Sequence, residues 1–130
     1  MMHSLNVADY FKLVKLKSKT VGFLIALSPN KDYRSFNYKW FERKYSSFIY
    51  VYRIVIALEY QNKGLGKDMY NDLLNFSKGK TNRIPCEVDI KPKNKQSMSF
   101  HKKYGFREVG IQHTEHRKKE VSLMMYTIND

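Results

Sequence analysis

Residues 48–79 read FIYVYRIVIALEYQNKGLGKDMYNDLLNFSKG and join two contrasting patterns through a short segment that contains glycine. The first part, Phe48 to Leu58, is rich in β-branched and aromatic residues, as is typical of a central strand. In the last part, Lys67 to Ser77, apolar residues recur at helical spacing, and Gly79 follows as a suitable helix terminator. The stretch therefore predicts a strand, a tight turn and a helix in direct succession.

The turn, Gln61 to Gly66, has the composition of an anion-binding loop. Its glycines, Gly64 and Gly66, permit positive φ angles and allow a ligand to approach the backbone closely. The first N–H groups of the following helix have no partner within the helix, and the helix dipole adds partial positive charge there. Lys63 and Lys67 increase that charge. The pattern is compatible with phosphate binding, and also with a tight turn that binds nothing.

The flanking residues extend this unit in both directions. They predict further strands at Phe11–Lys17, Val21–Leu27, Ile84–Ile90, Phe106–Ile111 and Val121–Ile128. A second helix is predicted at Asn94–Tyr104, and residues 28–47 form an aromatic and basic insert with a short helix of its own. This order predicts an α/β (α+β) domain, in which a mixed, mostly antiparallel central sheet is flanked by helices.

Length and composition limit the class of protein. A chain of 130 residues with 42% hydrophobic residues is long enough for one domain, residues 1–130, with a packed core. It has 24 Lys+Arg and 12 Asp+Glu, so its formal net charge is +12. Such a charge attracts nucleic acid, an acidic surface or a phosphorylated cofactor. The basic residues are spread over the whole chain without a nucleic-acid motif, which makes nucleic acid an unlikely partner.

The sequence also argues against a membrane helix, an internal disulfide and a metal site. The longest apolar run, Val21 to Leu27, is far shorter than the roughly 20 residues of a membrane helix, so we expect no membrane contact. A lone cysteine, Cys86, allows no internal disulfide, which is compatible with the reducing cytoplasm. His113 and His116 form an H-x-x-H pattern without further ligands, and we expect no metal.

Two motifs, about 30 residues apart, carry a resemblance to a known family. The first is Q-x-x-G-x-G, at Gln61, Gly64 and Gly66. The second is an Asn, a small residue three positions on, an aromatic pair and G-F, which here are Asn94, Ser97, Phe100-His101 and Gly105-Phe106. In this order the motifs resemble those of the GNAT superfamily of N-acetyltransferases. The stretch from Gly22 to Tyr52 resembles a little-characterised bacterial branch of predicted acetyltransferases.

The resemblance implies transfer of an acetyl group from acetyl-CoA to a primary amine, by direct attack in a ternary complex. It implies backbone pairing of the pantetheine arm with the strand and pyrophosphate binding by the turn. It also implies a CoA channel lined by the second motif. The implied cofactor-binding residues are Ile54, Val55, Ile56, Gln61, Asn62, Lys63, Gly64, Leu65, Gly66, Lys67, Asn94, Ser97 and Phe100. Asn94 also suits a helix N-cap, and both roles are compatible.

Amine acetylation needs a base for the ammonium and an acid for the departing thiolate. The resemblance implies Glu87 as the base; a solvated or ion-paired strand residue is the alternative, and Glu59 is a second carboxylate nearby. The family's acid is typically a Tyr, but this chain has His101 at that position. Tyr104 lies one helical turn further on, where it is either a substitute acid or a packing aromatic.

The acceptor side departs most from the family. About ten residues precede the first predicted strand. The family's N-terminal strand and helices, which cover the acceptor site, are therefore expected to be missing. A homodimer is one way to cover the sheet edge that this would leave exposed. Tyr33, Tyr38 and Trp40 of the insert are candidates for an acceptor pocket, or else they cap the sheet. The alternative functions are a catalytically inactive CoA-binding or protein-interaction member of the family, and a basic nucleic-acid-binding module.

Overall fold

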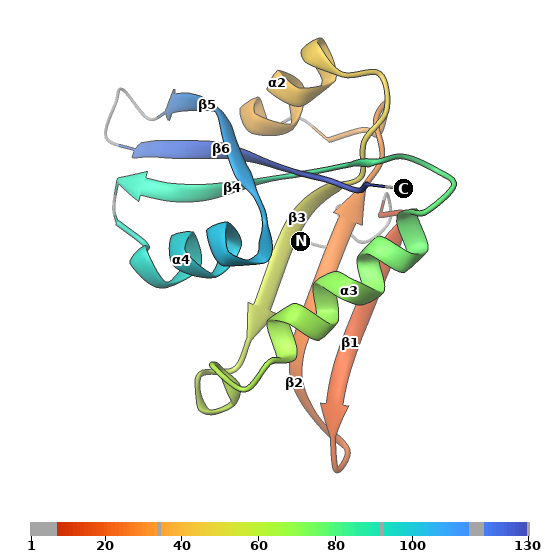
Figure 1. The fold of residues 1–130 in the computed structure, drawn as a ribbon, viewed down its shortest axis with the longest axis vertical. Helices are drawn as coiled ribbons and strands as arrows, with labels where there is room; N and C mark the ends of the chain where they lie inside the picture. The colour runs from red at the N-terminus through yellow and green to blue at the C-terminus, as the bar shows by residue number, and fades with distance from the viewer. Residues whose placement is uncertain (1–7, 34, 92, 115–118, 130) are drawn as a thin grey trace.

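The computed structural model describes residues 8–33, 35–91, 93–114 and 119–129 (Figure 1). The strands are β1 (Tyr10–Leu16), β2 (Lys19–Leu27), β3 (Tyr50–Ile56), β4 (Arg83–Lys91), β5 (Arg107–Thr114) and β6 (Lys119–Thr127). The helices are α2 (Phe36–Lys44), α3 (Leu65–Ser77) and α4 (Lys95–Tyr104), with a short 3-10 turn, η1 (Leu58–Tyr60). The predicted strand–turn–helix unit is β3, η1 and α3, and the helix begins two residues earlier than predicted.

The strands form two antiparallel sheets of three strands each, in the orders β1-β2-β3 and β4-β6-β5. This confirms the predicted fold class of antiparallel strands flanked by helices, although the sheet is divided in two. The two sheets meet where the N–H of Ile49 donates to the carbonyl of Arg83, at 3.0 Å. Beyond this point β3 pairs with β2 and β4 pairs with β6, so the two strands diverge (Figure 1).

The first core lies between the two sheets and α3. It contains the side chains of alternate residues on β4, Ile84, Cys86 and Val88, all nearly inaccessible to solvent. Tyr70 and Leu73 of α3 pack against them and have no exposed surface. Because side chains alternate along a strand, the residues between these, including Glu87, face the opposite side of the sheet.

The second core lies under α2, the helix of the insert. Tyr38 and Phe41 have no exposed surface and pack with Phe48, Tyr50 and Leu123. The rings of Tyr38 and Phe48 meet edge to face, with centroids 5.8 Å apart. Such aromatic contacts stabilise a core beyond the area that they bury. The insert is therefore a folded layer of the protein, packed on the face of the sheets that α3 does not cover (Figure 1).

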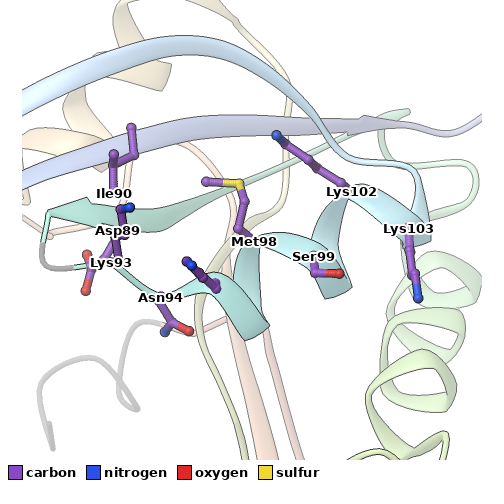
Figure 2. A pocket seen from close by; sticks show the side chains of 9 residues that line it. Asp89, Ile90, Lys93, Asn94, Met98, Ser99, Lys102 and Lys103 are labelled. Carbon is purple, nitrogen blue, oxygen red and sulfur yellow. The ribbon is translucent and has the colours of Figure 1, made fainter.

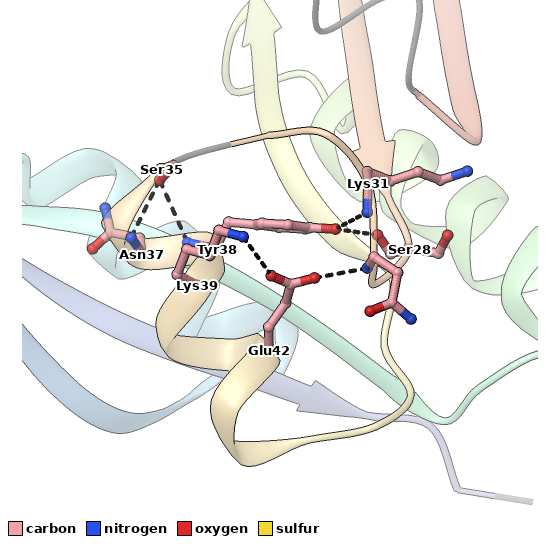
Figure 3. Close-up of polar contacts among 8 residues, drawn as sticks. Ser28, Lys31, Ser35, Asn37, Tyr38, Lys39 and Glu42 are labelled. Carbon is pink, nitrogen blue, oxygen red and sulfur yellow. Dashed lines mark hydrogen bonds and ion pairs between the residues drawn. The ribbon is translucent and has the colours of Figure 1, made fainter.

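Polar contacts within the insert hold α2 to the segment that follows β2 (Figure 3). Ser35 is the N-cap of α2, since its hydroxyl oxygen accepts from the backbone N–H of Asn37 (3.2 Å) and of Tyr38 (3.4 Å). The Tyr38 hydroxyl donates to the carbonyl of Ser28 (2.5 Å), where β2 has just ended. A Glu42 oxygen accepts from the N–H of Asn30 (2.7 Å). The helix is thus bound back to the strand that precedes it.

Within the part of the chain that the structure describes, no helix has the length and hydropathy needed to cross a membrane.

Replacing Phe41 with Ala should destabilise the protein by about 3–5 kcal/mol, because it leaves a cavity in the second core. Phe36→Ala is the matched control, since Phe36 lies on the same helix and is 73% exposed. Its effect should stay within about 0.5 kcal/mol. Urea unfolding of both variants measures the difference, and equal losses would contradict the docking of α2 described here.

Candidate active site

A groove of about 1100 Å³ opens where β3 diverges from β4. Its walls are the outer half of β3, the turn before α3, and α4, with Tyr126 of β6 at one end. It brings together most of the predicted cofactor-binding residues: Ile54, Val55, Ile56, Gln61, Asn62, Gly64, Gly66, Lys67, Asn94, Ser97 and Phe100. Lys63 and Leu65 belong to the same turn but do not line the groove. Because β3 pairs with β2 on its other side, the strand edge toward β4 offers unpaired backbone groups.

The turn has the backbone geometry that its glycines predicted. Gly64 is the N-cap of α3 and has a φ of +86°, in the left-handed region. Having no side chain, it leaves the first N–H groups of the helix open to a ligand. Gly66 is needed for close packing, since a Cβ there would lie 2.7 Å from the Phe100 ring. The N-terminus of α3 therefore presents its positive end to the groove, beside α4.

Side-chain amides connect the turn to both walls. The Gln61 amide donates to the carbonyl of Ile56 at 2.8 Å and accepts from the Gln96 amide at 3.0 Å. Gln96 was not predicted, since an exposed Gln in a first helical turn has no distinctive signal. Asn94 caps α4, with its side-chain oxygen accepting from the N–H of Ser97 at 3.1 Å. The N-cap role of Asn94 is therefore present, and the residue also lines the groove.

His101 does not occupy the position of a proton donor. It is 4% exposed, with Nδ1 at 2.8 Å from the carbonyl oxygen of Ser97 and Nε2 at 2.7 Å from the Tyr70 hydroxyl. A carbonyl can only accept, so Nδ1 carries the proton and Nε2 accepts from Tyr70. Burial lowers the pKa of His101, which keeps the ring neutral. His101 also lines the groove, but its one N–H is already used, which favours Tyr104 over His101 as the acid.

Tyr104 has the properties that His101 lacks. Its ring lines the groove, and its hydroxyl donates to the side-chain oxygen of Asn71 at 2.7 Å. Burial raises the pKa of Tyr104 to about 12, so the hydroxyl is protonated at neutral pH. Tyr126 packs beside it, with ring centroids 5.2 Å apart. Tyr126 was not predicted, because an aromatic residue on a closing strand is an ordinary core residue in sequence.

Glu87 faces away from α3 and lies under α2. Its carboxylate accepts hydrogen bonds from the Tyr50 hydroxyl and from the side-chain amide of Asn37. Burial raises the pKa of Glu87, which makes it a better proton acceptor near neutral pH. Neither donor was predicted, since the pairings join residues that lie 37 and 50 positions apart in the sequence. Glu59, the other carboxylate considered, is exposed and pairs with Lys19 at 3.5 Å.

The three aromatic residues of the insert that were predicted to line an acceptor pocket differ in their exposure. Tyr38 is fully buried, and the Trp40 ring packs against Gly110 of β5, where a Cβ would lie 2.6 Å from it. Both residues therefore pack on the sheet, and the full burial of Tyr38 corrects the expectation that it lines an acceptor pocket. Tyr33 is partly exposed and meets the Tyr52 ring edge-on, with centroids 5.2 Å apart.

A second pocket, of about 480 Å³, lies on the other side of α4 (Figure 2). Lysine side chains surround it, with Ile90 and Met98 between them; the lysines are Lys93, Lys95, Lys102 and Lys103. Part of the excess positive charge is thus concentrated beside the groove. Among the described residues, no group of His, Cys, Asp and Glu side chains gathers that could hold a metal ion. His116 lies outside the described residues.

Comparison with known proteins identifies the family. The sequence profile of the acetyltransferase (GNAT) family matches residues 4–106. The chain belongs to the GNAT family of acetyltransferases. The match to the family profile confirms the resemblance inferred from the two motifs. No curated protein matches the chain.

Solved structures share the fold. A GNAT acetyltransferase from Streptococcus pneumoniae is 20% identical, with a TM-score of 0.68, and the match covers 92% of this chain and 66% of that one. The ribosomal-protein-S18-alanine N-acetyltransferase from Escherichia coli is 16% identical, with a TM-score of 0.68, covering 99% and 76%. A GNAT acetyltransferase from Elizabethkingia anophelis, solved with acetyl-CoA bound, is 16% identical, with a TM-score of 0.71, covering 98% and 80%. At these identities the likeness establishes the fold alone.

The buried, neutral His101 should make stability fall at mildly acidic pH. Its folded pKa lies below the ordinary value of 6.5, so as pH falls through 6.5 the unfolded chain binds a proton that the folded protein does not. Between about pH 7 and pH 5, the wild type should lose more unfolding free energy than His101→Asn. Urea unfolding at both pH values measures this. Glu87 contributes equally to both proteins and cancels, so parallel losses would contradict the account of His101.

Proposed function

We propose that this protein is an acetyl-CoA-dependent N-acetyltransferase that transfers an acetyl group to a primary amine by direct attack in a ternary complex. The observation that supports this best is the groove, which joins an anion-binding helix N-terminus to an unpaired strand edge in a chain of the GNAT family. The pyrophosphate would bind at the turn, close to Lys63 and Lys67. The amides of the pantetheine arm would pair with the backbone of Ile54 to Ile56.

In the proposed reaction, Glu87 acts as the base and Tyr104 as the acid. The acceptor ammonium gives a proton to Glu87, and the free amine nitrogen then attacks the thioester carbonyl carbon. The new C–N bond forms as the C–S bond breaks, and the thiolate of CoA takes a proton from Tyr104. Tyr104 is protonated at neutral pH, as a proton donor must be, and the raised pKa of Glu87 makes its carboxylate a stronger base than an exposed Glu.

One observation favours a second candidate, a family member that binds CoA without turnover. The family's usual acid position holds His101, which is buried and already hydrogen-bonded. Under this alternative CoA binding is retained, and no primary amine is acetylated. Release of free thiol from acetyl-CoA, measured with a panel of primary amines and peptides, separates the two functions.

CoA binding should depend on the helix N-terminus at Gly64. Gly64→Glu places a carboxylate at the proposed pyrophosphate site and should weaken CoA binding at least about tenfold, as measured by isothermal titration. Gly79→Glu is the matched control, because Gly79 has nearly the same φ, +83°, near the other end of α3. It should bind CoA like the wild type. If the wild type does not bind CoA, the proposed function is wrong.

Turnover should depend on the Tyr104 hydroxyl. Tyr104→Phe removes the proton donor and should lower kcat by about 10²-fold or more, with CoA affinity unchanged. Tyr45→Phe, at the C-cap of α2, is the control and should keep full activity. His101→Asn should lose much less activity than Tyr104→Phe, because the one N–H of His101 is already hydrogen-bonded to the Ser97 carbonyl. The reverse order would restore His101 as the acid.

A further inference from the structure

The lysine-lined pocket on the other side of α4 is used neither by the proposed cofactor site nor by the proposed reaction (Figure 2). Its lining comes from the end of β4, from α4 and from the two residues that precede α4. Its volume of about 480 Å³ lies within the range of sites that hold ligands in proteins. The structure therefore has room for a second ligand here.

One face of α4 gives this pocket both charged and apolar side chains. Lys95, Met98 and Lys102 stand at positions i, i+3 and i+7 of the helix, so they share that face. The two lysines are exposed, whereas Met98 is partly buried against the first core. Figure 2 shows the Met98 side chain directed toward Ile90, with Lys102 reaching over the same space. Met98 and Ile90 therefore form an apolar floor, and a lysine stands on each side of Met98 along the helix.

The pocket has an excess of positive charge that the protein does not neutralise. Lys93 and Lys103 add two further ammonium groups to the lining. Of the described residues that line it, only Asp89 carries a carboxylate, and this is paired with Lys119 at 3.9 Å. Within the described part of the chain, none of the four lining lysines forms an ion pair. Because like charges on one surface repel each other, an anionic ligand would stabilise this arrangement.

The combination of lysines with an apolar floor favours an acidic peptide over a nucleic acid. Proteins that bind single-stranded nucleic acid stack its bases on aromatic side chains, and none of the described residues that line this pocket is aromatic. Arginine, which binds phosphate through two parallel hydrogen bonds, is also missing from that lining. Methionine is common at peptide-binding surfaces, because its flexible side chain adapts to different apolar partners. A peptide with carboxylates on both sides of an apolar side chain matches the lysines and the floor together.

The length of the lysine-bearing face sets the spacing of the charges in such a peptide. Lys95 and Lys102 are two helical turns apart, which is about 10 Å along the helix axis. An extended peptide spans that distance with about three residues. Two acidic residues three positions apart, with an apolar residue between them, would therefore reach both lysines while the apolar side chain contacts Met98.

We propose that this pocket is a docking site for an acidic peptide segment of a protein partner. The carboxylates of the segment pair with the lysines of α4, and an apolar side chain covers Met98 and Ile90. Asn94, Ser99 and Lys103 line both this pocket and the groove, so the segment lies beside the groove, with α4 between them. The inference goes beyond the proposed function and does not rest on it, because docking requires no acetyl-CoA.

The test uses the peptide acetyl-Glu-Asp-Leu-Glu-Asp-amide and a neutral counterpart in which Gln and Asn replace Glu and Asp. Binding is followed at low ionic strength by ¹⁵N NMR of the backbone amides. The acidic peptide should shift the signals of residues 93–103, and the neutral peptide should not. Replacing Leu with Gly in the acidic peptide should weaken binding at least about threefold, since the apolar floor is left uncovered. Equal binding of the acidic and neutral peptides, or shifts confined to other segments, would overturn the proposal.

Charge reversal at two positions tests whether the lysines of α4 are responsible. The double variant Lys95→Glu/Lys102→Glu should weaken binding of the acidic peptide at least about tenfold, since two attractive contacts become repulsive. Lys15→Glu/Lys17→Glu is the matched control, because it changes the net charge equally on β1 and the turn after it, in the other sheet. All four positions are exposed, so both variants should fold. If both lose affinity equally, the peptide responds to net charge alone and the proposal is wrong.

Two further probes distinguish this pocket from a nucleic-acid surface and from the cofactor site. Single-stranded oligothymidylate should bind more weakly than the acidic peptide; tighter binding that Lys95→Glu/Lys102→Glu abolishes would make nucleic acid the ligand and overturn the proposal. CoA should not displace the peptide, and displacement would assign the lysines to the cofactor site instead. A protein that binds the peptide but not CoA would refute the proposed function and leave the docking site standing.

Discussion

The hydrogen bond from the Ile49 N–H to the Arg83 carbonyl marks the point from which the two sheets separate. Both β3 (Tyr50–Ile56) and β4 (Arg83–Lys91) begin at this point. From there each strand continues with a different partner, β2 or β6, and the two strands diverge. The groove, the unpaired edge of β3 and the position of Glu87 all follow from that divergence.

Different helices cover the two faces of the sheets. Helices α3 and α4 cover one face and provide the groove, with the positive end of α3 directed into it. Helix α2 covers the other face and closes over Glu87. In the proposed reaction, cofactor and acceptor thus approach the opening from opposite faces, and their binding residues come from different segments of the chain.

Local features of the structure could be predicted from the sequence. The strand, turn and helix around Gly64 follow from periodicity and glycine chemistry, and the Asn94 cap follows from one residue's preference for a helix start. The family resemblance depended on the same two segments. Features set by contacts between distant residues could not be predicted. His101 matches a catalytic position in its motif, but its ring is bound by Tyr70, which lies 31 residues upstream.

The acceptor face illustrates the same limit. The sequence of the insert indicated an aromatic cluster, but which ring is buried depends on how α2 packs against β5 and β6. Asn37 had no signal of its own, since its role depends on meeting Glu87, 50 residues away. The division of the sheet was also missed, because the pairing of β4 with β6 is non-local and leaves no trace in the pattern of either strand.

CoA is proposed to bind in the groove between β3 and α4. Amide hydrogen exchange, measured with and without CoA, tests it directly. The account predicts slower exchange in the presence of CoA at the turn, residues 63–68, and on β3 at Ile54 to Ile56. Unchanged exchange at both segments, or protection confined to the lysine-rich pocket on the other side of α4, would contradict it.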